Sequence, residues 1–420
     1  MKVNKNVLHQ LNKAKKASRE FSLLPHTKRV LILKNLAREL RRNKKAIIAA
    51  NLKDVKKFSA TDPMRDRLLL NAARIEGMAK EIENVAALPD SLGEIFDSRV
   101  SHGLKISKKR VPIGVVGIIY ESRPNVTTDV AAICIKSGNV AVLKGGKEAR
   151  ESYVALHKII KKALVSAGGD SEAVQFIDPK IKDAAHAIIS ANDLVDVVIP
   201  RGSSNLINFV RENATVPVIE TGAGVCHTFV DESAKLNLAA KVVFNAKTQR
   251  PSVCNSLDTL LVHKNIAQEF LPLVASLLVK KEVRIFADSQ SYRVLKNHYP
   301  PKFLQPAKSS DFGCEFLSQK MSVKVVTNLN EALNHIAKYS SKHSEAILSE
   351  NKKNKERFLR EVDAAVVYTN ASTRFSDGAM FGLGSEIGIS TSKLHARGPM
   401  GPREITTYRW VVTGKYSTRR

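Results

Sequence analysis

The sequence predicts an α/β protein in which a parallel, doubly wound sheet is followed by a second α/β domain. Between residues 111 and 187, short apolar runs alternate with longer amphipathic stretches, as expected for strands and helices that take turns. A similar series returns after residue 218. Because open parallel sheets bind ligands beyond the carboxyl ends of their strands, the segments that follow the strands are the first candidates for function.

The composition is that of an ordinary globular protein. The chain has 420 residues, 43% hydrophobic and 25% charged, which suits two or three packed domains. It contains neither an apolar run of the roughly 18 residues that a membrane span needs nor a signal peptide, so we expect a cytoplasmic protein without a membrane partner. Four scattered cysteines without CxxC spacing indicate reduced thiols and predict no metal site.

The net charge of +27 is the unusual number. Residues 1–60 contain 17 basic and 3 acidic side chains, which suggests a nucleic-acid-binding surface as one hypothesis. These basic residues, however, fall on the polar sides of predicted amphipathic helices and lack interleaved stacking aromatics. We therefore interpret them as solvated helix faces that favour anionic ligands, and we expect no nucleic-acid partner.

The predicted elements follow in chain order. Helices are expected at 7–20, at 26–50 and from Asp62, and a hairpin at 94–109 turns at His102-Gly103. Strands at 113–120, 140–143, 174–176 and 195–199 then alternate with helices at 127–136 and 148–167. In the second domain, strands are predicted at 218–219, 228–230, 257–263, 323–326, 346–348 and 364–368, with helices at 232–246, capped by Asp231, and 266–280. The extended run 406–415 can pair with the hairpin or with another subunit.

Two turns between a predicted strand and a predicted helix are suited to phosphate or ribose. Lys144-Gly145-Gly146-Lys147 combines two glycines with two cations, and Gly202-Ser203 occupies the same position after a later strand. Plain turns of these sequences are also common, so that alternative remains open.

Cys254 lies in a polar loop between a predicted helix and strand, which is unusual for a core cysteine. Lys247 and Arg250 precede it, and nearby cations favour the thiolate that could form a thioester. A structural role remains the alternative. A cysteine–histidine pair would need a base, and nothing selects among His227, His335, His343 and His395. Three other segments, 120–125, 370–386 and 395–401, are polar in ways that a structural role does not demand. The last two are either surface loops or binding loops.

The chain resembles the gamma-glutamyl phosphate reductase family of the aldehyde dehydrogenase superfamily from its first helix to its end. The strings Asn-Ala-Lys-Thr-Gln-Arg-Pro-Ser at 245–252 and Lys-Leu-His-Ala-Arg-Gly-Pro-Met-Gly at 393–401 are highly specific to that family. The resemblance implies an aldehyde dehydrogenase-like fold: a Rossmann-type cofactor domain, an α/β catalytic domain and a small β oligomerisation element. It also implies NADPH-dependent reduction of L-glutamyl 5-phosphate to L-glutamate 5-semialdehyde, the second step from glutamate to proline.

The resemblance assigns roles to individual residues. Cys254 matches the nucleophile and Asn125 the oxyanion asparagine. Lys144 matches the lysine that meets the adenosine ribose, and Glu315 the glutamate that holds the nicotinamide ribose. Lys147 stands where NAD-preferring relatives often carry glutamate, so a cation there should attract the 2′-phosphate of NADP. Candidates for the substrate carboxylate and phosphate are Arg123, Arg250, Arg374 and Arg397.

The resemblance also implies a domain plan. We expect an NADP-binding domain at 1–92 and 113–225 with a return segment near 380–400, and a catalytic domain at 226–379. An oligomerisation element at 93–112 and 401–420 implies a homodimer or homotetramer, and glutamate 5-kinase is a possible partner. Three alternatives remain: a hydrolysing aldehyde dehydrogenase that makes the free acid, a nucleic-acid-binding protein with an enzyme-like fold, and a pseudoenzyme.

Overall fold

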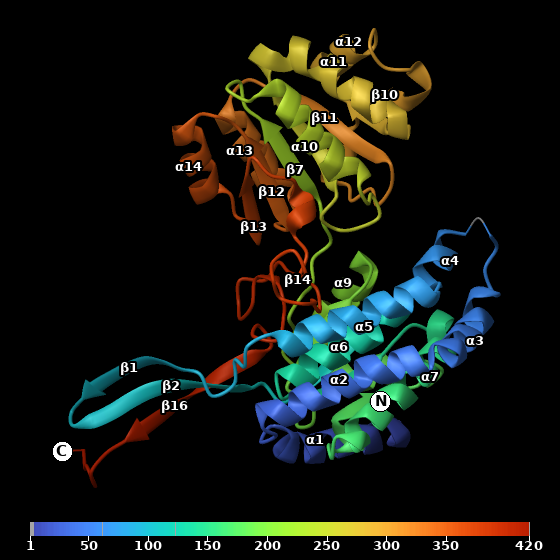
Figure 1. The fold of residues 1–420 in the computed structure, drawn as a ribbon. Helices are drawn as coiled ribbons and strands as arrows, with labels where there is room; N and C mark the ends of the chain where they lie inside the picture. Colours follow the sequence, from blue (N-terminus) through green and yellow to red (C-terminus); the bar gives the residue numbers. More distant parts are fainter. Residues whose placement is uncertain (1–3, 61, 122, 420) are drawn as a thin grey trace. The chain divides into compact units, whose positions relative to one another are not determined.

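The structure, a computed structural model, describes residues 4–60, 62–121 and 123–419. The chain forms two units, and each is described by itself (Figure 1). The first unit extends to Thr221 and also includes 381–388 and the chain from residue 394 onward. The second comprises Gly222–Met380 and Ile389–Lys393. Within the described residues, no helix is both long and apolar enough to cross a membrane.

A four-stranded parallel sheet forms the centre of the first unit, in the order β5-β4-β3-β6. Its strands are β3 (Val115–Tyr120), β4 (Val140–Lys144), β5 (Val174–Phe176) and β6 (Val197–Arg201). After β3 the chain adds β4 and β5 on one side and returns to place β6 on the other. The direction of winding therefore reverses between β3 and β6, which is where such sheets open a ligand crevice.

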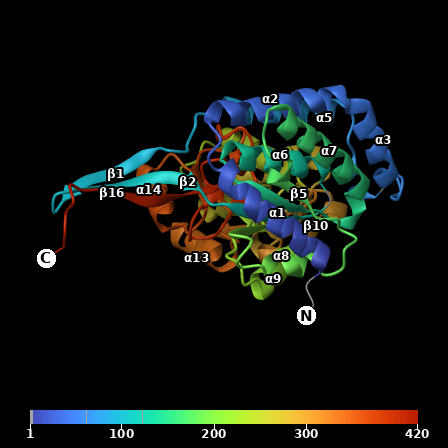
Figure 2. The same cartoon turned by 90° about the horizontal axis from the view of Figure 1, so that it is seen from below.

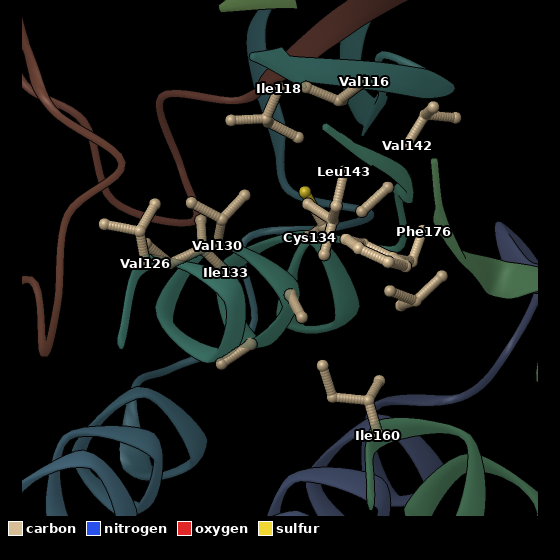
Figure 3. Packing of buried hydrophobic residues seen from close by; sticks show 14 of the residues in the cluster. Val116, Ile118, Val126, Val130, Ile133, Cys134, Val142, Leu143, Ile160 and Phe176 are labelled. Carbon is tan, nitrogen blue, oxygen red and sulfur yellow. The ribbon is translucent and has the colours of Figure 1, made fainter. Parts of the chain in front are cut away.

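Helices surround this sheet. α6 and α7 pack against its strands, α2 and α5 form a further layer on them, and α1 and α8 contact β3 (Figures 1 and 2). The helices are α1 (Lys5–Phe21), α2 (His26–Arg42), α3 (Lys44–Val55), α4 (Pro63–Leu68), α5 (Ala72–Ala87), α6 (Pro124–Lys136), α7 (Arg150–Ser166), α8 (Ala184–Ile189) and α9 (Ser204–Asn213). Cys134 of α6 is fully buried against Leu143 and its apolar neighbours, so this cysteine is a small core residue (Figure 3).

The second unit contains a seven-stranded parallel sheet in the order β10-β9-β11-β8-β7-β12-β13. Its strands are β7 (Cys226–Val230), β8 (Leu257–His263), β9 (Arg284–Ala287), β10 (Leu304–Pro306), β11 (Lys320–Val326), β12 (Ser344–Leu348) and β13 (Val366–Thr369). Its helices are α10 (Leu236–Thr248), α11 (Ala267–Leu278), α12 (Ser289–Leu295), α13 (Leu329–Tyr339) and α14 (Lys352–Glu361). Leu260 and Val262 pack with α10 and α11, whereas Leu261 packs with α13, because successive side chains of a strand face opposite sides.

The early hairpin and the C-terminal strand form a separate antiparallel sheet in the first unit. β1 (Ile95–Ser101) and β2 (Leu104–Pro112) join at His102 and Gly103, which both have positive φ, and β16 (Thr406–Thr413) pairs along β2. The C-terminal run therefore pairs with the hairpin of its own chain. β1 and β16 are left as the two edges of this sheet.

The predicted α/β class and aldehyde dehydrogenase-like fold are confirmed, but several details of the prediction were wrong. The predicted strand at 218–219 forms only an isolated bridge to Val198 and belongs to the first unit. The predicted helix at 26–50 is divided at Asn43, whose φ of −98° and ψ of 15° end α2 before α3 begins. Asp231 does not cap α10, since its carboxylate accepts hydrogen bonds from Ser233 and Ser349 and the helix begins five residues later. β9 and β10 were not predicted because strands of four and three residues show too little periodicity.

Candidate active site

Cys254 lies half-buried in a short loop between the end of α10 and the start of β8. The next residue, Asn255, is buried and ties this loop to the segment that follows β13, at the 3₁₀ turn Thr373–Phe375. Its Nδ2 donates to the Ser376 carbonyl at 2.7 Å, and its own carbonyl accepts from the Thr373 hydroxyl at 2.8 Å. The loop that carries the thiol is therefore held by specific hydrogen bonds on its C-terminal side.

Arg374 connects both ends of the Cys254 loop. Its Nε donates to Gln249 Oε1 at 2.8 Å, and its Nη1 donates to Asn255 Oδ1. Burial lowers the pKa of the Arg374 guanidinium, and the charge of Arg250 lowers it further, whereas Asp377 and the Cys254 thiolate act in the opposite direction. The structure thus brings Arg250 and Arg374 close to Cys254, with Asp377 also near Arg374.

Glu315 and Cys226 both make hydrogen bonds close to this loop. Glu315 Oε1 accepts a hydrogen bond from the Gly224 N–H at 2.7 Å. The Cys226 thiol lies 3.2 Å from the Cys254 carbonyl, to which it donates, and burial raises its pKa well above the usual value. Cys226 is therefore a protonated donor, unlike Cys254, which the sequence predicts to be the nucleophile.

Lys247 differs from the sequence-based expectation of a cation that acts on the thiol. It is fully buried, donates to the Leu257 carbonyl at 2.9 Å and lies 3.5 Å from Asp258 Oδ1. Burial lowers the pKa of Lys247 and raises that of Asp258, while each partner's charge counteracts the shift. Asp258 also accepts from the Phe316 N–H, so the pair connects α10, β8 and the residue after Glu315.

The four candidate histidine bases have partners of their own. His227 lies 3.1 Å from Glu345, and both side chains are fully buried. His343 lies 2.9 Å from the Ser344 hydroxyl, and His395 of the first unit lies 2.6 Å from the Glu404 carbonyl. His335 packs against the ring of His227. These contacts favour structural roles for the histidines.

In the first unit, the turn at Gly202-Ser203 already holds an anionic group. Glu121, directly after β3, accepts hydrogen bonds from the Ser203 N–H at 2.8 Å and from its hydroxyl at 2.7 Å. A Cβ at residue 202 would lie 2.6 Å from the Glu121 carboxyl carbon, so glycine is needed for this approach. The amino end of α9, at the reversal point of the sheet, is thus suited to an anion.

The other glycine-rich turn connects β4 to α7. Lys144 is the last residue of β4, and burial lowers the pKa of its ammonium group. Gly145 is buried against the ring of Tyr153, whereas Gly146 is partly exposed. Lys147 is exposed at the start of a 3₁₀ turn (Lys147–Ala149) that leads into α7. The turn presents one half-buried and one exposed cation beside a helix amino terminus.

Asn125 lies in the first turn of α6, and Arg123 precedes that helix as its N-cap. The Asn125 amide donates to Asp129 Oδ2 at 2.9 Å. Burial, followed by the charge of Glu81, raises the pKa of Asp129 to about 8, so this carboxyl is mostly neutral at pH 7. Arg123 and Arg397 belong to the first unit, whereas the other two candidate arginines belong to the second.

Sequence reasoning gave no role to Glu121, Gly224, Cys226, Asn255 and Asp129. Glu121 and Asn255 lie inside polar segments that the sequence singled out, but their partners come from distant segments. The fragment Gly222-Ala223-Gly224 is too short to be recognised as a phosphate-binding glycine motif. Among the residues that the structure describes, no group of three or more potential ligands is placed to bind a metal ion.

Comparisons with known proteins identify the relatives of this chain. The profile of the aldehyde dehydrogenase family matches residues 2–288. A gamma-glutamyl phosphate reductase of Chlorobium limicola is 49% identical over 418 residues, which is 99% of this chain and 100% of that protein. The crystal structure of the gamma-glutamyl phosphate reductase of Thermotoga maritima is 44% identical, with a TM-score of 0.93 and coverage of 99% of this chain and 100% of that one.

A more distant structure shares only the fold. An engineered glycolyl-CoA reductase, solved with bound NADP⁺, is 14% identical with a TM-score of 0.71 over 97% of this chain and 96% of that one. Full-length identity near one half, together with the family profile, settles the wider relationship and confirms the resemblance read from the motifs. The chain belongs to the aldehyde dehydrogenase family, within the group of gamma-glutamyl phosphate reductases.

Proposed function

We propose that this protein reduces L-glutamyl 5-phosphate to L-glutamate 5-semialdehyde with NADPH and releases phosphate, the second step of proline biosynthesis from glutamate. The observation that carries this proposal is the half-buried Cys254 in a loop braced by Arg374, with Arg250 close enough to act on the charge of Arg374. The activity in the names of its full-length relatives supports the same reaction.

Cys254 acts as the nucleophile in this proposal. Its thiolate attacks the acyl carbon of the substrate, phosphate leaves with the electrons of the broken C–O bond, and a thioester forms on the sulfur. Negative charge develops on the carbonyl oxygen in this step and again during reduction. The Asn125 amide and the Cys254 backbone N–H stabilise that charge, and such a donor is typically worth roughly 3–4 kcal/mol. Arg123, Arg250, Arg374 and Arg397 are the candidates that bind the substrate's carboxylate and phosphate.

NADP(H) fits the residues of the first unit. The Glu121 carboxylate at the amino end of α9 is a stand-in for a phosphate oxygen, which shows that the turn accommodates an anion. Gly202 and Ser203 would hold the pyrophosphate, and Lys144, Gly145, Gly146 and Lys147 the adenosine ribose and its 2′-phosphate. Glu315 of the second unit would hold the nicotinamide ribose. When bound there, NADPH would supply the hydride that reduces the carbonyl carbon.

The same proposal includes the protein's surroundings. It acts in the cytoplasm as a homodimer or homotetramer, and glutamate 5-kinase supplies its unstable substrate. The three-stranded sheet of β1, β2 and β16 (93–112 and 401–420) serves oligomerisation. Residues 1–92 and 113–225, with the return near 380–400, bind NADP, and 226–379 form the catalytic domain.

The decisive experiment measures the reverse reaction. Wild-type protein should reduce NADP⁺ with glutamate semialdehyde only when phosphate is present, because phosphate is needed to release the acyl group from sulfur. Cys254→Ala should lose turnover, whereas Cys314→Ala, a matched change at another partly buried cysteine, should keep most of it.

Other outcomes identify the alternatives. Equal rates with and without phosphate would indicate a hydrolysing aldehyde dehydrogenase. Turnover in Cys254→Ala would mean that the nucleophile is misassigned. Tight, salt-sensitive binding of nucleic acid without any turnover would support the nucleic-acid-binding alternative.

A further inference from the structure

Gly224 contacts two functional residues of the second unit at once. Its backbone N–H donates to Glu315 Oε1 at 2.7 Å. Its Cα faces the backbone of Cys254: a Cβ at residue 224 would lie 1.5 Å from the Cys254 carbonyl oxygen and 2.8 Å from the Cys254 Cα. Both separations are below 3.0 Å, which Cβ atoms essentially never show, so the cysteine backbone occupies the space that a side chain would need.

A second residue of the same segment, Cys226, also contacts the Cys254 carbonyl. The buried Cys226 thiol donates to this oxygen at 3.2 Å. Cys226 is the first residue of β7 and pairs with Leu257 at the start of β8, directly after the Cys254 loop. The segment from Gly224 to Cys226 therefore packs against the peptide group that follows Cys254 and donates a hydrogen bond to it.

We infer that Gly224 is a positioning residue that couples the placement of the Cys254 nucleophile to that of Glu315. The inference rests on the proposed function, since it takes Cys254 as the nucleophile and Glu315 as the ribose acceptor. Displacement of residue 224 moves the cysteine backbone through contact and moves the glutamate through the hydrogen bond. A misplacement of about 1 Å at a reacting group can cost about a hundredfold in rate.

The Cys254 loop is also attached to a second segment of the chain. Asn255 fixes the loop to Ser376, so the cysteine cannot simply move away from a bulkier residue 224. A methyl group there must displace either the Cys254 peptide or the segment 222–226. The second displacement breaks the Gly224–Glu315 hydrogen bond, so the cofactor contact changes with the thiol.

The test uses the full-length protein without substrate and measures two quantities. One is the rate at which iodoacetamide alkylates Cys254, followed by peptide mass spectrometry, and the other is the dissociation constant of NADPH. Gly224→Ala should slow alkylation at least tenfold and weaken NADPH binding at least fivefold. Gly77→Ala, a helical change with open space around the new methyl, should alter neither. Wild-type alkylation in a folded Gly224→Ala protein would overturn the inference.

A second pair of variants decides the matter if Gly224→Ala does not fold. Glu315→Gln and Glu315→Ala both remove the negative charge, but only glutamine keeps an oxygen for the Gly224 N–H. The alanine variant should alkylate Cys254 at least threefold more slowly than the glutamine variant. Equal rates would overturn the coupling. Because alkylation needs no turnover, this result is independent of whether Cys254→Ala abolishes the proposed reaction.

Discussion

The carboxylate of Glu121 occupies the amino terminus of α9, where it accepts two hydrogen bonds from Ser203. A helix amino terminus favours negative charge, and it favours the charge of a phosphate as well as that of a carboxylate. If Ser203 binds the cofactor's pyrophosphate, the two anions compete for the same N–H and hydroxyl. Glu121 must then turn away whenever NADPH binds.

Replacement of Glu121 by glutamine should therefore tighten NADPH binding. The amide loses the charge that makes the carboxylate a strong competitor, so we expect the dissociation constant to fall about three- to tenfold, equivalent to roughly 0.7–1.4 kcal/mol. Titration of NADPH fluorescence measures this directly. Glu212→Gln, at the exposed carboxyl end of the same helix, is the control and should leave affinity unchanged. Weaker binding in Glu121→Gln would show that the carboxylate contributes to the cofactor site.

Lys147 should select NADPH over NADH. Its exposed ammonium can approach the 2′-phosphate, which NADH lacks, whereas both cofactors share every other group. Lys147→Ala should raise the dissociation constant of NADPH about tenfold and leave that of NADH within a factor of two. Lys158→Ala, an exposed lysine of the following helix, should change neither. A parallel loss of affinity for both cofactors would remove Lys147 from the specificity role.

Arg374 should act on the substrate and leave the cofactor unaffected. Loss of its guanidinium removes a charged donor and the link between Gln249 and Asn255, and a hydrogen bond to a charged group contributes about 1.5–3 kcal/mol. In the reverse assay, Arg374→Ala should lower kcat/KM for glutamate semialdehyde about ten- to a hundredfold with unchanged KM for NADP⁺. The control is Arg357→Ala, which breaks an exposed pair with Glu361. An increase confined to the cofactor KM would contradict this assignment.

The sequence predicted features that depend on local pattern. Strand β8 and the polar loop before it could be predicted, because a buried strand and an exposed turn differ in composition over several residues. The division of one predicted helix at Asn43 was not legible, since asparagine costs a helix little on its own.

The site residues that the sequence did not predict were missed for a different reason. Gly224 and Asn255 are defined by contacts with residues 30 to 121 positions away, as with the Ser376 carbonyl that receives the Asn255 amide. The burial of Lys247 has the same origin: its partner Asp258 lies on the next strand, so a lysine that reads as a solvated cation is enclosed by tertiary packing. Pairing across elements leaves no periodic signal in one sequence.

Two buried histidines should make the second unit sensitive to acid. Burial lowers the pKa of His335 to about 3, assisted by the charges of His227 and Lys324, and burial alone lowers that of His343 to about 4. In the unfolded chain both should titrate near 6.5. Below that pH the two histidines bind protons in the unfolded chain but not in the folded chain. The free energy of unfolding is therefore highest above about pH 6.5 and decreases as the pH falls.

Each histidine should lower the free energy of unfolding by about 2 kcal/mol as the pH falls from 7 to 5. We expect the urea midpoint, followed by far-ultraviolet circular dichroism, to fall over this interval, and the fall to shrink in His335→Gln and in His343→Gln. The two changes should add in the double variant, because each removes one proton uptake. His298→Gln, at an exposed position of the same unit, should retain the full wild-type pH dependence. A wild-type pH response in both buried-site variants would show that these histidines are already protonated in the folded protein, or that other groups dominate its acid sensitivity.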